Sequence, residues 1–447
     1  MFKFLDDGVT NAGLTREGLF YCGLVFRQVG LALRALYNKG EFNYLDRNNK
    51  YYKKLSKIPN WYYALLFTGG KYFQNINDSH YHPDYPLFGF LLTFGDLRPK
   101  LVSHIWELCL GESGLGTFGQ DISFSRSSLF EAMICHPGAI GNTFLPKDIP
   151  MLFCKQQGYT VSKTVGTGNQ AVLTFNSGPY IGVVHDQSDN NHFTFSYKGV
   201  PLVIDAGYSN IPKEGSPSSS YGHSSVVING RGQLPSGKGK GCSGKIIFTK
   251  FNETHTIIVG DSTSSYCESD YNSVLWAYRH CVFVKQPFPY LLIFDDVCKK
   301  LNKKSEFTFV YNSLFSNRLE IKEKTVCGIF DFEGRQVGLK HHILFPEESV
   351  SIKHEIKETQ NCIPVDKRIV WYFSCSKINP HFINMFIPFQ YGSLPECAFN
   401  VRKGERDIDV FLDWKTLPMQ DIVSFPLIDL KNNKKAIYAN FSRKIKL

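Results

Sequence analysis

From about residue 151 to the C-terminus, short segments rich in β-branched and aromatic residues follow one another without a break. Examples are AVLTF, HFTFSY, KIIFTKF, HCVFVK, YLLIF and IVWYF. Segments of this length and composition are typical of β-strands. Because no helical segments separate them, the pattern predicts a large antiparallel β-sandwich rather than a parallel sheet.

Helical signals occupy the first 150 residues instead. Apolar residues at helical spacing predict an amphipathic helix over about residues 17–37: Leu19, Cys22, Val25, Val29, Leu33 and Leu36. Pro59 and Pro99 stand where two further helices are expected to begin, and Ser127 or Ser128 is a candidate cap for another. We therefore expect an α+β protein of two domains, with a helical domain in residues 1–150 and a β-sandwich in residues 151–447.

Composition and charge exclude several classes of protein. The net charge of +10 is spread along the chain rather than gathered into a basic arm, so we expect no nucleic-acid partner. No apolar run is long enough to span a bilayer, and the opening residues do not resemble a signal peptide. The chain is therefore either cytoplasmic or lacks its natural N-terminus. The twelve cysteines contain no CxxC pair, which favours reduced thiols over a disulfide framework.

One hairpin places potential site residues together. If Lys198 and Gly199 form a two-residue turn, Tyr197 lies opposite Val200, and the same register places His192 opposite Asp205. Phe193 then lies opposite Ile204 on the apolar face, while His192 and Asp205 share the polar face. These two residues lie near a loop that bears His185, Gln187 and Asp189.

Histidine and aspartate in such a place indicate a metal site or a proton-transfer site. The alternative is that Asp189 and Asp205 cap turns and that the histidines are simply exposed.

The chain carries His185-x-Gln187-x-Asp189, then Gly199-x-Pro201-Leu202-x-x-Asp205-x-Gly207, and then His223 before VVING. This order of residues resembles the signature of the β-sandwich in heparinase II/III-like polysaccharide lyases. The resemblance implies that His185 is catalytic and that Asp205 and His223 bind zinc or a related divalent cation. Gln187 stands where the family has a further histidine ligand. Since glutamine is a poor zinc ligand, either His192 supplies the missing ligand or the metal is weakly bound or absent.

The N-terminal region extends the resemblance. Asp7-Gly8, Glu17-Gly18 and Tyr21 are similar to the DG…EGxxY segment of the (α/α) toroid in the same family. This likeness implies that Tyr21 is the catalytic acid, and often also the base, with Glu17 orienting it. Gly69-Gly70 with Asn77-Asp78-Ser79 resembles a loop of the substrate cleft. The family residue that neutralises the substrate carboxylate has no counterpart, and the toroid is short of helices, so we expect an incomplete toroid in a truncated or divergent member.

The implied activity is eliminative cleavage of an acidic, uronate-containing polysaccharide. Substrate contacts are expected from Asp78, His80 and Asp189, and from Arg279 through bidentate pairing with a carboxylate. The other interpretation of Arg279 is a structural ion pair with Asp295 or Asp296. The alternative function, from a different class, is a non-catalytic relative that binds acidic glycans in surface polysaccharide metabolism.

If the natural N-terminus is missing, the family resemblance suggests a bacterial periplasmic or secreted protein.

Overall fold

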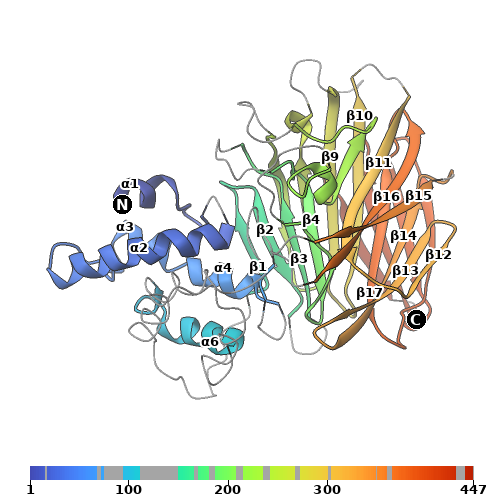
Figure 1. The fold of residues 1–447 in the computed structure, drawn as a ribbon. Coiled ribbons are helices and arrows are strands. Elements are labelled where there is room, and N and C mark those ends of the chain that lie inside the picture. The colour runs from blue at the N-terminus through green and yellow to red at the C-terminus, as the bar shows by residue number, and fades with distance from the viewer. Residues whose placement is uncertain are drawn as a thin grey trace.

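In the computed structural model, helices lie at one end of the molecule and β-sheets are stacked at the other (Figure 1). The structure describes residues 1–15, 18–67, 72–74, 94–110, 149–165, 170–180, 187–207, 215–234, 242–266, 272–300, 304–348, 350–359, 365–428 and 438–445. None of the described helices is long and apolar enough to cross a membrane.

All described α-helices precede Met151. They are α1 (Phe2–Asp7), α2 (Gly18–Asn38), α3 (Lys50–Leu55), α4 (Ile58–Leu65) and α6 (Pro99–Leu110). The helix expected over residues 17–37 is confirmed as α2, whose buried stripe includes Leu19, Phe26 and Leu33. Pro59 lies in the first turn of α4 and Pro99 begins α6, as expected. The helix expected after Ser127 or Ser128 lies outside the described residues. A helical N-terminal region is therefore present, although these helices alone do not show a closed toroid.

The described strands form four antiparallel sheets. The first, in sheet order, comprises β1 (Met151–Cys154), β2 (Tyr159–Lys163), β3 (Ala171–Asn176), β4 (His192–Tyr197) and β5 (Val200–Val203). The second comprises β15 (Ser351–Glu358), β16 (Lys367–Lys377), β11 (Ser305–Leu314) and β6 (Ser225–Ile228). The third comprises β12 (Leu319–Lys322), β13 (Thr325–Phe332), β14 (Arg335–Phe345), β17 (Phe382–Gln390), β10 (Tyr290–Lys299), β9 (Val274–Val284), β8 (His255–Asp261) and β7 (Lys245–Phe251). The fourth comprises β18 (Cys397–Lys403), β19 (Asp407–Trp414), β20 (Met419–Pro426) and β21 (Asn440–Ile445).

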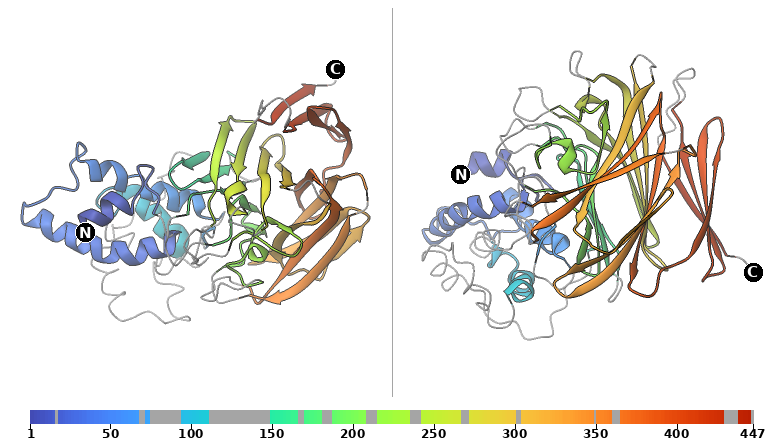
Figure 2. Two further views of the ribbon diagram at one scale, coloured as in Figure 1. Left: turned by 90° about the horizontal axis from the view of Figure 1, so that it is seen from above. Right: turned by 45° about the vertical axis from the view of Figure 1, so that its right-hand side comes forward.

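The first two sheets join into one layer, which we call the front layer. Ile204, just after β5, pairs with Asn312 of β11, and its backbone N–H donates to the Asn312 carbonyl at 2.9 Å. The main core lies between the front layer and the eight-stranded sheet, where Phe193 packs on Phe386 and Phe195 on Phe283. The fourth sheet forms the outermost layer, on the side away from the helices (Figure 2). The predicted antiparallel β-sandwich is therefore confirmed, with this further sheet packed against it.

The helices contact the outer face of the front layer. Trp61 of α4 packs against Tyr159 of β2, with ring centroids 6.1 Å apart. Gln74 is buried, and its side chain bonds to the hydroxyls of Thr194 and Ser196 on β4. The helical region is thus fixed to the strand that begins with His192.

Candidate functional site

Three polar side chains from separate elements meet on the outer face of the front layer. His192 is the first residue of β4, Asp205 follows β5, and His223 follows the 3₁₀ turn η1 (Ser220–Gly222). Asp205 Oδ2 lies 3.3 Å from His192 Nε2 and 3.2 Å from His223 Nδ1. One ligand atom from each residue lies within 4.8 Å of the other two, so the three residues form a potential metal-binding cluster.

The β4–β5 hairpin brings His192 and Asp205 together, but not in the register that its turn alone predicts. Tyr197 pairs with Val200 as expected, and both turn residues have positive φ, 51° at Lys198 and 79° at Gly199. A β-bulge between Phe195 and Ser196 then shifts the register, and the ladder ends at Val203. The predicted pairing of Phe193 with Ile204 is therefore wrong, because the bulge shifts the register and the ladder ends before it reaches these residues. The predicted proximity of His192 to Asp205 is nevertheless confirmed.

The cluster is fully buried, and its charges depend on one another. Burial lowers the pKa of His192 to about 4, although Asp205 opposes the shift. Burial alone would raise the pKa of Asp205, but the charge on His223 and the close contacts with both histidine rings lower it. Burial likewise disfavours the charged form of His223, and the Asp205 carboxylate outweighs this effect and raises its pKa. Without a metal, the favoured state is an ion pair of His223 with Asp205 beside a neutral His192.

Backbone N–H groups fix two of the three side chains. Asp205 Oδ1 accepts from the N–H of Gly207 at 2.7 Å, and Gly207 has a φ of +86°, which explains the Asp-x-Gly spacing. His192 Nδ1 accepts from the N–H of Ser224 at 2.8 Å. Within the described part of the chain, neither ring nitrogen of His223 has a hydrogen-bond partner of good geometry.

The donor set fits a divalent cation, with one conflict. Tetrahedral zinc with nitrogen and oxygen ligands at roughly 2.0–2.1 Å holds neighbouring ligand atoms roughly 3.3 Å apart, close to the distances around Asp205. The buried nitrogens of His223 also favour a ligand there. However, His192 Nδ1 accepts a hydrogen bond, so a neutral His192 carries its proton on Nε2, which then cannot coordinate a metal. Metal binding through His192 therefore requires release of its bond from Ser224.

The loop before β4 is fixed by asparagines and a glutamine that sequence reasoning missed. Asn176 lies opposite His192 in the β3–β4 pair, and its Nδ2 donates to Asp189 Oδ2 at 2.6 Å. Asn190 and Gln233 form two hydrogen bonds, from the backbone N–H of Asn190 to Gln233 Oε1 and from Gln233 Nε2 to the Asn190 carbonyl. The sequence carries no local signal for these contacts, because each joins segments that only the fold brings together.

Gln187 and Asp189 are both buried in this loop. The burial of Asp189, with its bond from Asn176, indicates a role in holding the loop rather than in contacting substrate directly.

Arg279 does not have the substrate-binding role expected of it. It lies in β9, is 1% exposed, and forms a bidentate ion pair with Asp295 of β10 at 2.6 and 2.9 Å. Its Nη1 donates to the carbonyls of Asn191 and Ser224, the residues that adjoin His192 and His223. The structural alternative is therefore the correct one: Arg279 supports the cluster from beneath.

The remaining sequence-derived candidates belong to the helical region and its loops. Tyr21 lies in the first turn of α2 and is partly buried. Glu17, Asp78, His80 and His185 lie outside the described residues.

Comparison with known proteins supports the sequence resemblance. The family model described as heparinase II/III-like, C-terminal, matches residues 147–339, which include the whole cluster. Residues 147–339 are therefore similar to the C-terminal region of heparinase II/III-like proteins. None of the curated protein sequences matches the chain at a significant level.

Several solved heparinase structures have a similar fold. One heparinase III structure superposes with a TM-score of 0.69 at 12% identity, covering 95% of this chain and 62% of that one. Another gives 0.67 at 16% identity, covering 95% and 60%. The heparan sulfate lyase HepC from Pedobacter heparinus gives 0.66 at 14% identity, covering 96% and 61%. The chain thus shares their fold and spans about 60% of the length of these heparinases.

Proposed function

We propose that this chain is a polysaccharide lyase that cleaves an acidic, uronate-containing polysaccharide by β-elimination. The observation that carries the proposal is the buried cluster of His192, Asp205 and His223 within a heparinase II/III-like β-sandwich. The helical region, which we propose is part of an incomplete (α/α) toroid, packs on the same face of the front layer. Junctions between domains are common places for such clefts.

The reaction needs a base to remove the proton beside the uronate carboxylate and an acid to protonate the leaving glycosidic oxygen. We assign the acid role to Tyr21, which also serves as base in one version of the mechanism, and assign His185 as base or stabiliser. Glu17 orients the Tyr21 hydroxyl. The phenol and imidazole groups can perform these proton transfers when the site tunes their pKa values.

The proposed role of the cluster is to hold the His185 loop in place. A divalent cation such as zinc would be held by Asp205 and His223, and by His192 once it gives up the bond from Ser224. Bound there, the cation would supply a rigid cross-link between β4, β5 and η1. Its affinity would be modest, because position 187 offers a glutamine and His192 is held by a competing hydrogen bond.

A non-catalytic glycan-binding protein is the second candidate. One observation favours it: Gln187 departs from the family pattern. Binding of an acidic polymer without any cleavage would identify this alternative.

Mass spectrometry of reaction products tests the proposal. Purified protein is incubated with heparan sulfate, chondroitin sulfate and alginate. Elimination gives oligosaccharides lighter by one water than the products of hydrolysis at the same bond. Products of the lighter mass support a lyase, whereas products that have gained water indicate a hydrolase and contradict the proposal.

A further inference from the structure

Beside the cluster, the outer face of the front layer carries a set of exposed and partly buried residues, which we call the tyrosine surface: Tyr221, Tyr372, Lys353, Glu355 and Lys357. Tyr372 of β16 lies directly opposite Lys353 of β15, and Glu355 lies opposite Val370. Directly opposed residues share a face of the sheet. Their neighbours Trp371 and Phe373 point into the core, so Tyr372 and Lys353 project outward.

The two tyrosines form a platform over a small apolar base. Their ring centroids are 6.2 Å apart, and both pack against Val227, Val310 and Val370. Both hydroxyls lie at the surface, where Tyr221 donates to the Gly230 carbonyl at 2.9 Å and Tyr372 donates to Glu355 at 3.2 Å. The rings are therefore held in place while remaining partly exposed.

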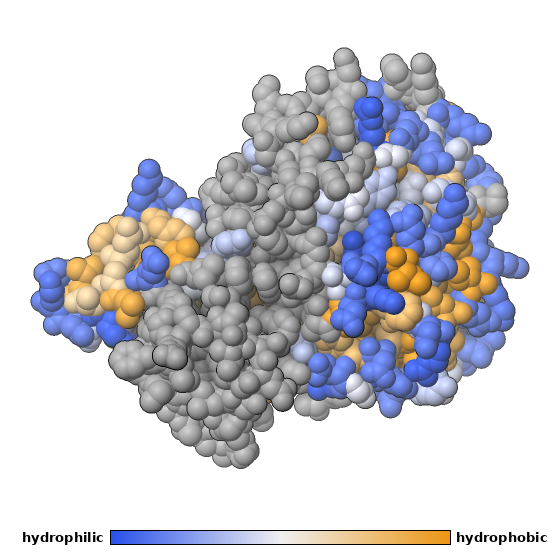
Figure 3. Space-filling view, viewed as in Figure 1, coloured by the Kyte–Doolittle hydropathy of each residue, from blue (hydrophilic) through white to orange (hydrophobic). Residues whose placement is uncertain are grey.

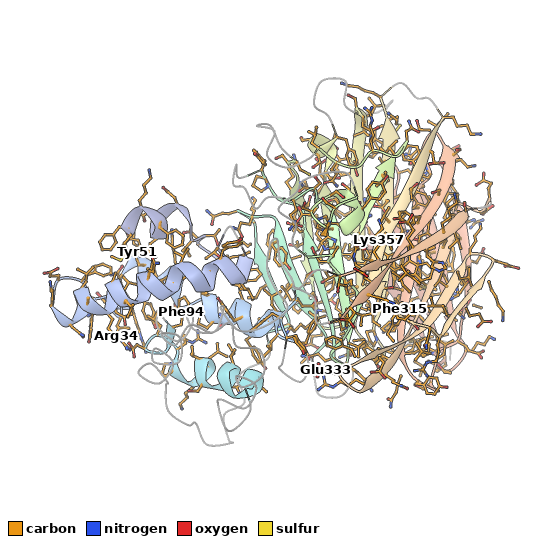
Figure 4. The ribbon with its side chains drawn as sticks, viewed as in Figure 1. Arg34, Tyr51, Phe94, Phe315, Glu333 and Lys357 are labelled. Atoms are coloured by element: carbon orange, nitrogen blue, oxygen red, sulfur yellow. The ribbon has the colours of Figure 1, made fainter. Side chains whose placement is uncertain are left out.

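Lysines border this platform. Lys357 lies 3.2 Å from Glu355, and its side chain is 33% exposed. Figure 4 places Lys357 on the side of the sandwich that carries β15 and β16, and in Figure 3 hydrophobic and hydrophilic residues alternate over the same strands. With Lys353, the border carries two positive charges against the single negative charge of Glu355.

The platform is continuous with the candidate site. Tyr221 belongs to η1, which leads directly into His223. The Tyr221 carbonyl accepts from Asn312 Nδ2 at 3.1 Å, and the Asn312 carbonyl accepts from the N–H of Ile204, the residue before Asp205. A polymer that binds on the front layer beside η1 can therefore continue onto the tyrosine surface.

We propose that the tyrosine surface is an extended binding site for an acidic polysaccharide chain that is cleaved at the proposed site of Tyr21 and His185, which the buried cluster supports. Pyranose rings present C–H faces that pack on aromatic rings, and the tyrosines supply such faces with a polar edge. Lys353 and Lys357 attract the carboxylates or sulfates of the chain. This inference rests on the proposed function for its ligand class, but it concerns binding beyond the reacting sugars.

The test compares long and short acidic chains. Binding of heparan sulfate and alginate polymers, and of their tetrasaccharides, is measured by calorimetric titration with the full chain. In Tyr221→Ala/Tyr372→Ala, the dissociation constant for the long polymer should rise about tenfold, as for loss of aromatic contacts at an interface. In Lys353→Gln/Lys357→Gln, binding should weaken and depend less steeply on salt. The advantage of the long polymer over the tetrasaccharide should shrink in both variants.

Matched changes elsewhere provide the controls. Tyr391→Ala removes a tyrosine that is 61% exposed, and Lys415→Gln removes a lysine paired with Glu396; both should bind as the wild type does. If the tyrosine variant is destabilised, the lysine pair still tests the proposal, because both lysines are surface residues. Three results would overturn the tyrosine surface. They are unchanged affinity in the lysine double variant, a loss of affinity no larger than in the control variants, and no binding of either polymer by the wild type. Weakened binding without any cleavage product would retain the surface and contradict the lyase instead.

Discussion

His192 Nε2 lies 3.3 Å from Asp205 Oδ2, although a β-bulge removes the hairpin register that would place the two residues directly opposite one another. The bulge ends the ladder early and frees the backbone after Val203 to turn toward Asn312. Beyond the bulge, Asp205 contacts both His192 and His223. The contact between His192 and Asp205 is thus a property of the irregular hairpin.

Elemental analysis tests the metal. Protein purified without chelator should contain a divalent cation at less than one ion per chain, because Gln187 is a poor ligand and Ser224 competes for His192. Gln187→His should raise the occupancy and the melting temperature, and a chelator should reverse that gain, since a ligand that binds only the folded state stabilises it.

His223→Asn is the companion variant, because it should lower the occupancy further. If neither the wild type nor Gln187→His contains metal, the three residues are a hydrogen-bonded cluster without a cation.

Arg279→Met should destabilise the fold rather than weaken substrate binding. The change leaves Asp295 as an unpaired buried charge, a loss of about 3–5 kcal/mol in the free energy of unfolding. Arg279→Met/Asp295→Leu should recover part of that loss, because no buried charge remains. Urea unfolding measures both effects. A variant of normal stability with a raised KM would instead return Arg279 to the substrate site.

The stability of the protein should fall in acid because several histidines are buried in the neutral form. Burial lowers the pKa of His280, His341 and His381 to about 3, below the value of ~6.5 in an unfolded chain. The unfolded state therefore binds protons first as the pH falls below about 6.5, and stability decreases until the pH nears 3. Each histidine contributes about 1.4 kcal/mol per pH unit across this window.

His280→Leu isolates one of these contributions. The range from about pH 6 to about pH 4 lies between the pKa of His280 in the unfolded chain and its pKa in the folded protein. In this range, the unfolding free energy of the variant should change with pH less steeply than that of the wild type, by about 1.4 kcal/mol per pH unit. Equal slopes for wild type and His280→Leu would show that His280 is not held neutral.

Local patterns predict much of this fold. Apolar spacing identifies α2, two prolines mark the beginnings of α4 and α6, and the Lys198-Gly199 turn sets the start of the β4–β5 ladder. Each of these signals lies within a few residues of the structure that it predicts, so no knowledge of distant contacts is required.

Contacts between distant segments escape such patterns. Nothing in the hairpin sequence indicates either the bulge after Phe195 or the pairing of Ile204 with Asn312 of β11. The ion pair of Arg279 with Asp295 depends on the register between β9 and β10, and that register decides between substrate contact and structural support. The role of Asn176 likewise appears only when β3 and β4 are paired.

The most direct test of the proposed lyase is the ultraviolet absorbance of a conjugated unsaturated uronate, followed during incubation with heparan sulfate, chondroitin sulfate and alginate. The wild type should produce this absorbance with at least one polymer. Tyr21→Phe, which removes only the hydroxyl, should abolish it while leaving polymer binding nearly intact, because the lost interaction belongs to the transition state. Absence of the absorbance with every polymer, or turnover by Tyr21→Phe close to that of the wild type, would contradict the account.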